Sequence, residues 1–141
     1  MQTFYSSSPE ETQEIGRKIG KALNGNEVIA YYGGMGMGKT TLTWGIADAL
    51  GVNDGVSSPT FALVNEYSGK YKIYHFDMYR VTSLDDLYST GFFDYIGNGV
   101  LLIEWSENIP FAIEDGFIKV HFEQGNTDCE RIITIEGIDL N

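Results

Sequence analysis

Residues 33–40 read Gly33-Gly34-Met35-Gly36-Met37-Gly38-Lys39-Thr40, which fits the phosphate-binding pattern G-x-x-x-x-G-K-[ST], the P-loop. Glycines let successive backbone N–H groups of such a loop turn toward phosphates, because no Cβ atom obstructs that conformation. The lysine reaches the β- and γ-phosphates of a nucleoside triphosphate, and the hydroxyl after it ligates Mg²⁺. The segment therefore predicts a nucleotide site with Lys39 on the phosphates and Thr40 on Mg²⁺. A glycine-rich turn without a ligand is the alternative.

The flanks agree with this interpretation, because a P-loop needs a strand before it and a helix after it. Glu27–Tyr32 is rich in apolar and aromatic residues and predicts a short strand. Thr40–Leu50 predicts a helix that Gly51 ends, and the helix N-terminus would add partial positive charge at the phosphates. The residues expected to contact the nucleotide from this segment are Gly33, Met35, Gly36, Met37, Gly38, Lys39, Thr40 and Thr41.

A second helix is expected near the N-terminus. Ser8 can cap it, Pro9 fits its first position, and Glu11 completes a capping box. One apolar stripe then follows at helical spacing, and Gly25 ends the helix. The residues of the stripe are Ile15, Ile19, Ala22 and Leu23. No strand is expected before this helix.

The rest of the chain alternates strand and helix signals. Runs rich in β-forming residues predict two hairpins, and Val100–Glu104 is a continuous apolar run typical of a buried strand. The hairpins are Phe61–Tyr67 with Tyr71–Asp77, and Phe117–Glu123 with Arg131–Glu136; short helical turns are expected from Ser83 and over Phe92–Ile96. A length of 141 residues favours one domain. We therefore expect an α/β fold, a P-loop NTPase-like mixed sheet flanked by helices with a C-terminal β-hairpin, spanning residues 1–141.

Two acidic residues end predicted strands. A P-loop needs a second anchor for Mg²⁺, normally an Asp at the end of a hydrophobic strand, and Asp77 fits that position. Glu104 ends the buried run and could hold Mg²⁺, orient the attacking water, or do both. We expect Lys39, Asp77 and Glu104 to carry catalysis, with Thr40, Asp77 and Glu104 on the metal. Solvated carboxylates at strand ends are the alternative.

Other polar residues are less decisive. Ser57–Thr60 lies one helix beyond the P-loop, where nucleotide hydrolases keep a loop that senses the γ-phosphate, so Thr60 is a candidate sensor. A Ser-Pro turn leading into a strand explains the same residues. His75 and His121 lack metal-like spacing, and ordinary packing or surface roles are favoured for both.

The composition limits the partners. Twenty acidic against nine basic residues give a formal net charge of −11, and no basic cluster provides the counterion release on which nucleic-acid affinity depends. Strong direct tRNA binding is therefore not expected. Cys129 is the only cysteine, which excludes an internal disulfide. The first residues lack a signal-peptide pattern and no apolar run could span a bilayer, so a cytoplasmic protein without a membrane association is expected.

Together these segments resemble the TsaE family, formerly called YjeE, across nearly the whole chain. The stretches that carry the resemblance are Glu10-Glu11-Thr12, Gly36-Met37-Gly38-Lys39-Thr40-Thr41-Leu42, Ser58-Pro59-Thr60-Phe61, His75-Phe76-Asp77-Met78-Tyr79-Arg80 and Ile103-Glu104-Trp105. The resemblance implies a subunit that binds ATP or ADP with Mg²⁺ and slowly hydrolyses ATP. It also implies TsaB and TsaD as partners, in an assembly that installs threonylcarbamoyl on adenosine 37 of tRNAs that read codons beginning with A.

The resemblance also assigns residues. It puts Lys39 and Thr40 on phosphate and Mg²⁺, makes Glu104 Mg²⁺-associated with Asp77 as its neighbour, and places Thr60 in a switch loop. It brings two further residues, Thr12 and Arg131, toward the base or ribose. Arg80 and Trp105 belong to the family's signature without an assigned role.

The chain departs from the family's usual pattern in two places. Gly34, Met35 and Met37 fill variable loop positions where relatives usually carry Asp, Leu and Ala, so packing around the phosphates can differ. Trp44 stands where relatives often carry Arg or Lys; it is either an outward hydrophobic anchor for a partner or a buried helix-packing residue.

Three rival functions remain open. A P-loop small-molecule kinase would need an acceptor pocket and usually an Arg-rich lid, whereas this chain has only Arg17, Arg80 and Arg131. A GTPase is disfavoured because no Asn-Lys-x-Asp segment occurs. A binding module gated by nucleotide without hydrolysis is the third.

Overall fold

A computed structural model describes residues 1–34, 36–52 and 64–140. Its centre is a mixed seven-stranded sheet in the order β1-β7-β6-β2-β5-β4-β3. The strands are β1 (Gln2–Ser6), β2 (Val28–Tyr32), β3 (Val64–Ser68), β4 (Lys72–Asp77), β5 (Val100–Glu104), β6 (Ile118–Gln124) and β7 (Arg131–Glu136). The helices are α1 (Pro9–Ala22), α2 (Lys39–Ala49), α3 (Leu84–Ser89) and α4 (Phe92–Tyr95), with 3₁₀ turns η1 (Ser106–Asn108) and η2 (Pro110–Ala112).

Four parallel strands occupy the middle of the sheet. β2 pairs in parallel with β5 and β6, and β4 pairs in parallel with β5. The remaining pairings are antiparallel: β3 on β4, and the C-terminal hairpin of β6 and β7, with β1 on β7. The predicted α/β fold with a mixed sheet and a C-terminal hairpin is confirmed.

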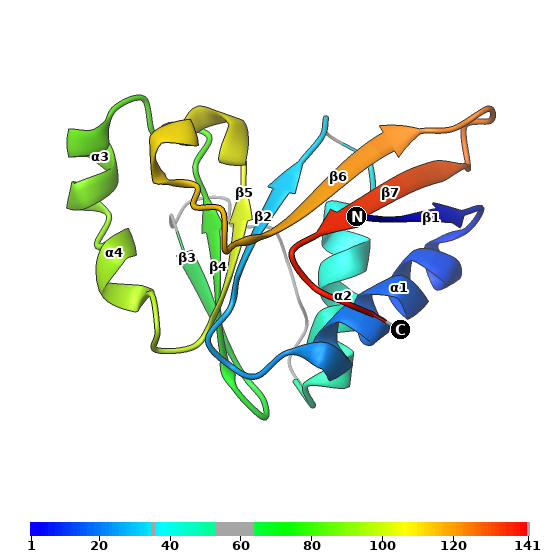
Figure 1. The fold of residues 1–141 in the computed structure, drawn as a ribbon, viewed down its shortest axis with the longest axis horizontal. Helices are drawn as coiled ribbons and strands as arrows, with labels where there is room; N and C mark the ends of the chain where they lie inside the picture. The colour runs from blue at the N-terminus through cyan, green and yellow to red at the C-terminus, as the bar shows by residue number, and fades with distance from the viewer. Residues whose placement is uncertain (35, 53–63, 141) are drawn as a thin grey trace.

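The sheet is covered on both faces, as Figure 1 shows. Successive side chains of a strand point to opposite faces, and along β5 Leu102 belongs to one core cluster whereas Leu101 and Ile103 belong to another. The first cluster packs against α1 and α2 through residues such as Ile19 and Ile46, and the second lies under α3, α4 and the 3₁₀ turns. The central strands are therefore buried on both sides, which explains the continuous apolar run of β5.

Helices α1 and α2 approach each other closely. A Cβ atom on Gly16 would collide with the carbonyl oxygen of Leu42 and lie 3.0 Å from Cα of Gly45, and a Cβ on Gly45 would collide with the carbonyl oxygen of Gln13. The two glycines thus allow backbone-to-backbone contact. Ser8 caps α1 as expected, accepting a hydrogen bond from the N–H of Glu11.

Strand β1 was not expected from the sequence. Its exposure alternates between half-buried and exposed positions up to the buried Ser6, and Phe4 is the residue that packs on the core. The strand is held by pairing with β7, where Gln2 lies opposite Ile135 and Phe4 opposite Ile133. Such an edge strand depends on a partner from the other end of the chain, so its own pattern is weak.

Other boundaries differ slightly. Helix α2 begins at Lys39 and ends at Ala49, one residue earlier at each end than expected. The strand expected at Phe61–Tyr67 is found as Val64–Ser68, and residues 61–63 lie outside the described residues. In the part of the chain that the structure describes, no helix has the length and hydropathy needed to cross a membrane.

Candidate functional site

The phosphate loop joins the carboxyl end of β2 to the amino end of α2. Gly33, Gly36 and Gly38 have φ values of 140°, 75° and 104°, in the left-handed region that glycine adopts without strain. Gly38 is the residue that precedes the first turn of α2. The loop therefore has the backbone freedom that a phosphate cradle needs, directly before a helix N-terminus.

Lys39 begins α2 and lies against an indole ring. Its side chain is 7% exposed, and Nζ is 5.4 Å from the centroid of the Trp105 ring. An ammonium over an indole face is attracted by the ring quadrupole. Trp105 has a φ of 62°, a left-handed value that no other non-glycine residue in the described ranges adopts. A strained backbone thus presents the ring to the lysine, the kind of arrangement that occurs at functional sites.

The two candidate acids are neighbours across parallel strands. Asp77 of β4 lies opposite Glu104 of β5, and Ala30 of β2 lies opposite Ile103 of β5. Since these strands are parallel, their carboxyl ends meet at one end of the sheet, where the phosphate loop also starts. Asp77 Oδ1 accepts a hydrogen bond of 2.9 Å from the N–H of Tyr79. The sequence-based expectation that both acids end strands is confirmed, and the sheet brings them together.

His75 is a residue whose setting the sequence did not reveal. It is fully buried, and its Nε2 lies 2.6 Å from Oε2 of Glu104. It pairs with Leu102 in the β4–β5 register, so Glu104 is its diagonal neighbour on the same face. The available signal was an ionisable residue inside an otherwise apolar strand, but the strand order that brings Glu104 beside it was needed to recognise the pair.

A short segment after β5 ties three strand ends together; we call residues 105–108 the η1 brace. Glu107 Oε2 accepts a 3.1 Å hydrogen bond from the N–H of Gly33. Asn108 Nδ2 donates to the carbonyl oxygens of Met78 and Tyr79 at 2.9 and 3.1 Å. The brace thereby connects the end of β5 to the phosphate loop and to the segment that follows β4.

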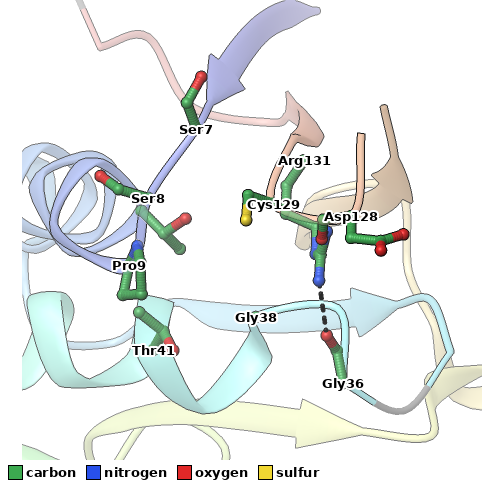
Figure 2. A pocket seen from close by; sticks show the side chains of 10 residues that line it. Ser7, Ser8, Pro9, Gly36, Gly38, Thr41, Asp128, Cys129 and Arg131 are labelled. Atoms are coloured by element: carbon green, nitrogen blue, oxygen red, sulfur yellow. Dashed lines mark hydrogen bonds between the residues drawn. The ribbon is translucent and has the colours of Figure 1, made fainter. Parts of the chain in front are cut away.

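A cavity of about 360 Å³ lies beside the phosphate loop, lined in part by Gly36 and Gly38. It is bounded by the start of α1, the first turn of α2 and the β6–β7 connection, which face one another in Figure 2. Its lining residues are Ser7, Ser8, Pro9, Thr12, Gly36, Gly38, Thr41, Asp128, Cys129 and Arg131. Of the residues expected at a nucleotide, Thr12, Gly36, Gly38, Thr41 and Arg131 are therefore brought together here; Lys39, Asp77 and Glu104 are not among the lining residues.

Two contacts shape this cavity. Arg131 donates from a guanidinium nitrogen to the carbonyl oxygen of Gly36 at 3.3 Å, drawn as the dashed line in Figure 2. Thr12 is buried, and its hydroxyl is 2.7 Å from that of Ser6. The β7 strand and the β1–α1 junction are thus both anchored close to the phosphate loop.

A family model described as "Threonylcarbamoyl adenosine biosynthesis protein TsaE" matches residues 6–133. This chain belongs to the TsaE family. The resemblance inferred from the P-loop and the strand-end motifs is therefore confirmed.

Individual relatives give the same result. The chain is 43% identical over 137 residues to a protein of Aquifex aeolicus named tRNA threonylcarbamoyladenosine biosynthesis protein TsaE, covering 95% of this chain and 86% of that protein. A Bacillus subtilis protein of the same name is 34% identical over 133 residues, covering 93% and 82%. A solved structure titled "Crystal structure of Bacillus subtilus YdiB" superposes with a TM-score of 0.74 at 28% identity, covering 99% of this chain and 86% of that one.

Other residues expected at the site of this TsaE-family chain fall into two groups. Met35 and Thr60 lie outside the described residues, as does the segment Ser57–Thr60. The structure does describe Thr40 and Trp44. Thr40 lies in the first turn of α2, is partly exposed and contacts another group of the protein. Trp44 is 47% exposed on α2, so the alternative that it is a buried packing residue is wrong.

The residues present fit Mg²⁺ and a nucleotide in chemical type. Mg²⁺ prefers oxygen ligands and is commonly bound by one or two carboxylates together with substrate phosphates. Asp77 and Glu104, side by side near the loop, provide such carboxylates. Within the described ranges no group of three or more His, Cys, Asp or Glu residues could hold a metal ion alone.

Proposed function

We propose that residues 1–141 act as one P-loop ATPase domain that binds ATP or ADP with Mg²⁺ and slowly hydrolyses ATP. Its hydrolysis would serve the TsaB–TsaD assembly in threonylcarbamoyladenosine formation at position 37 of tRNA. Membership of the TsaE family supports a role in threonylcarbamoyladenosine biosynthesis. The observation that carries the chemistry is the register of Asp77 opposite Glu104 beside the phosphate loop.

The loop would hold the phosphates mainly through its backbone. N–H groups around Gly36 and Gly38 would donate to phosphate oxygens, and Met35 and Met37 would contribute backbone donors although their side chains are bulky. Lys39, partly shielded by Trp105, would contact the β- and γ-phosphates. Thr40 and Thr41 would place hydroxyls at the same helix start.

Thr40, Asp77 and Glu104 are the residues that would hold Mg²⁺. When bound, the ion would neutralise phosphate charge and orient the γ-phosphate. Glu104 would also orient the attacking water and accept its proton, a role that suits a partly buried carboxylate with a fixed orientation. Lys39 would stabilise the charge on the transferred group. Thr60 would sense the γ-phosphate.

The cavity beside the loop is proposed as the adenosine site. At about 360 Å³ it falls within the usual range for ligand pockets, and Thr12 and Arg131 would line the base or ribose. Arg131 already bonds the loop at Gly36, so nucleoside and phosphate sites would be linked by one side chain.

The net charge of the chain and its family together suggest TsaB and TsaD as protein partners. A net charge of −11 repels nucleic acid, so the contact with the tRNA pathway would be protein to protein, in the cytoplasm. The exposed indole of Trp44 on α2 is one hydrophobic surface available to TsaB or TsaD.

The test is turnover measured in four settings: protein alone, with TsaB–TsaD, with candidate small-molecule acceptors, and with GTP in place of ATP. We expect slow ATP hydrolysis that depends on Mg²⁺ and changes when TsaB–TsaD is added. Phosphoryl transfer to an acceptor would establish the kinase alternative. ATP binding without turnover in any setting would leave only the nucleotide-gated binding module.

A further inference from the structure

The only buried imidazole in the described residues touches the only strand-end glutamate of the central parallel strands. His75 is 0% exposed in the middle of β4, and Glu104 is 13% exposed at the end of β5. Their 2.6 Å separation is that of a strong, charge-assisted hydrogen bond. The ring also packs near Tyr67, with centroids 6.2 Å apart. A buried polar ring fixed on both sides has little freedom to rotate.

The second ring nitrogen indicates which atom carries the proton. Among the residues that the structure describes, no group makes a hydrogen bond to Nδ1 of His75. A buried N–H without an acceptor is costly, and the close contact at Oε2 of Glu104 provides an acceptor for Nε2. We therefore assign the proton to Nε2, where it can be donated to Oε2 of Glu104, and leave Nδ1 unprotonated.

We propose that His75 is a positioning residue for Glu104: its Nε2–H holds Oε2, so that Oε1 is directed toward the nucleotide and its metal. The inference rests on the proposed role of Glu104 and deepens it. A glutamate at a strand end has three side-chain torsions, and a fixed donor restricts them before the ligand arrives. Groups that support a ligating carboxylate in this way typically contribute about 10–100-fold to metal affinity or activity.

The first test needs neither substitution of His75 nor activity. His75 and His121 are the only histidines, so ¹⁵N-histidine labelling gives two ring systems, assigned with His121→Gln. We expect the nucleotide-free protein to show a slowly exchanging proton on Nε2 of His75 whose signal moves in Glu104→Gln. A proton on Nδ1 instead of Nε2, or a signal unaffected by Glu104→Gln, would overturn the proposal.

The second test is kinetic. Gln can place an amide N–H near the position of the His Nε2 atom, whereas Leu of similar size cannot donate. His75→Leu should lower kcat for ATP hydrolysis by about tenfold while KM stays within about twofold, and His75→Gln should restore much of the rate. His121→Gln, on the half-exposed histidine of β6, is the matched control and should leave the rate unchanged.

A double substitution separates positioning from general damage. If His75 acts through Glu104, then His75→Leu should have almost no effect on kcat in a Glu104→Ala background. An equal loss in both backgrounds would show that His75 acts independently and would overturn the inference. If Glu104→Ala alone left hydrolysis intact, the proposed role of Glu104 would fail while the ATPase activity itself would stand, and the ring-proton measurement would still decide whether the hydrogen bond exists.

Discussion

Glu107 holds the first residue of the phosphate loop: its Oε2 accepts a 3.1 Å hydrogen bond from the N–H of Gly33, 74 positions earlier in the chain. Two turns, one after β2 and one after β5, are thereby joined at the same end of the sheet. Since the acceptor belongs to the η1 brace, the loop is coupled to the segment that carries Trp105.

The Glu107 contact should matter for nucleotide affinity more than for folding. Glu107→Ala removes the acceptor and should weaken ADP binding by about three- to tenfold, the equivalent of one ordinary hydrogen bond. Glu107→Gln keeps an acceptor oxygen and should lose less. Calorimetric titration of both variants with ADP measures the difference; equal affinities for Ala and wild type would mean that the contact does not organise the loop.

Lys39→Ala should abolish tight nucleotide binding in a folded protein. The side chain lies over the Trp105 ring, and if it serves the phosphates as proposed, its loss would remove phosphate contacts with little loss of packing. Thermal unfolding without ligand should change little, whereas the stabilisation by added ATP should disappear. A calorimetric ATP affinity equal to that of the wild type would refute the assignment of the loop.

Glu104→Ala should impair turnover more than binding. A group that orients water or metal contributes mainly in the transition state, so kcat should fall by at least about tenfold while ADP affinity changes little. Steady-state hydrolysis in the assembled complex measures this. Wild-type rates there would mean that Glu104 takes no part in hydrolysis and serves the fold through its contact with His75.

The α1–α2 contact offers a stability test. Gly16→Ala would force a Cβ against the carbonyl oxygen of Leu42, and we expect a loss of about 1–3 kcal/mol in the free energy of unfolding, as for other overpacked sites. Gly116→Ala is the control, since no atom lies within 4 Å of the Cβ that alanine would add there, and the φ of Gly116 is not left-handed. Urea unfolding of both should separate them clearly; similar stabilities would contradict the close packing.

Free tRNA should not bind measurably at physiological salt. The net charge of −11 and the dispersed lysines give no patch from which counterions could be released. Arg17, the centre of the most basic stretch, is already paired with Glu14 and Asp48. A gel shift with bare tRNA at two salt concentrations is the measurement, and tight binding that resists salt would contradict the protein-mediated role.

Much of the molecule could be predicted from local signals. The capping residues of α1, the strand before the P-loop and the apolar run of β5 each carry their own pattern, and all were found. The acids at 77 and 104 became candidates because each ends such a run, and their position at strand ends is confirmed. What the sequence did not reveal depends on strands from distant parts of the chain: β1 exists through β7, and the His75–Glu104 pair exists through the β4–β5 register.

The contact between Lys39 and Trp105 has the same origin. A tryptophan after a strand-end glutamate gives no indication that its backbone is left-handed, because that conformation is imposed by the turn into η1. Only the assembled ends of β2 and β5 place the ring beside the lysine. Side-chain roles that arise from tertiary geometry were therefore beyond a pattern-based prediction.

The cavity beside the phosphate loop is built from both ends of the chain. Ser7 to Thr12 form one wall and Asp128 to Arg131 the other, and the amide of Gln2 reaches the carbonyl oxygen of Ile138, 136 positions away. Bringing such distant segments together costs loop-closure entropy, which slows folding. A ligand that contacts both walls would therefore stabilise the molecule only once these two distant segments have come together.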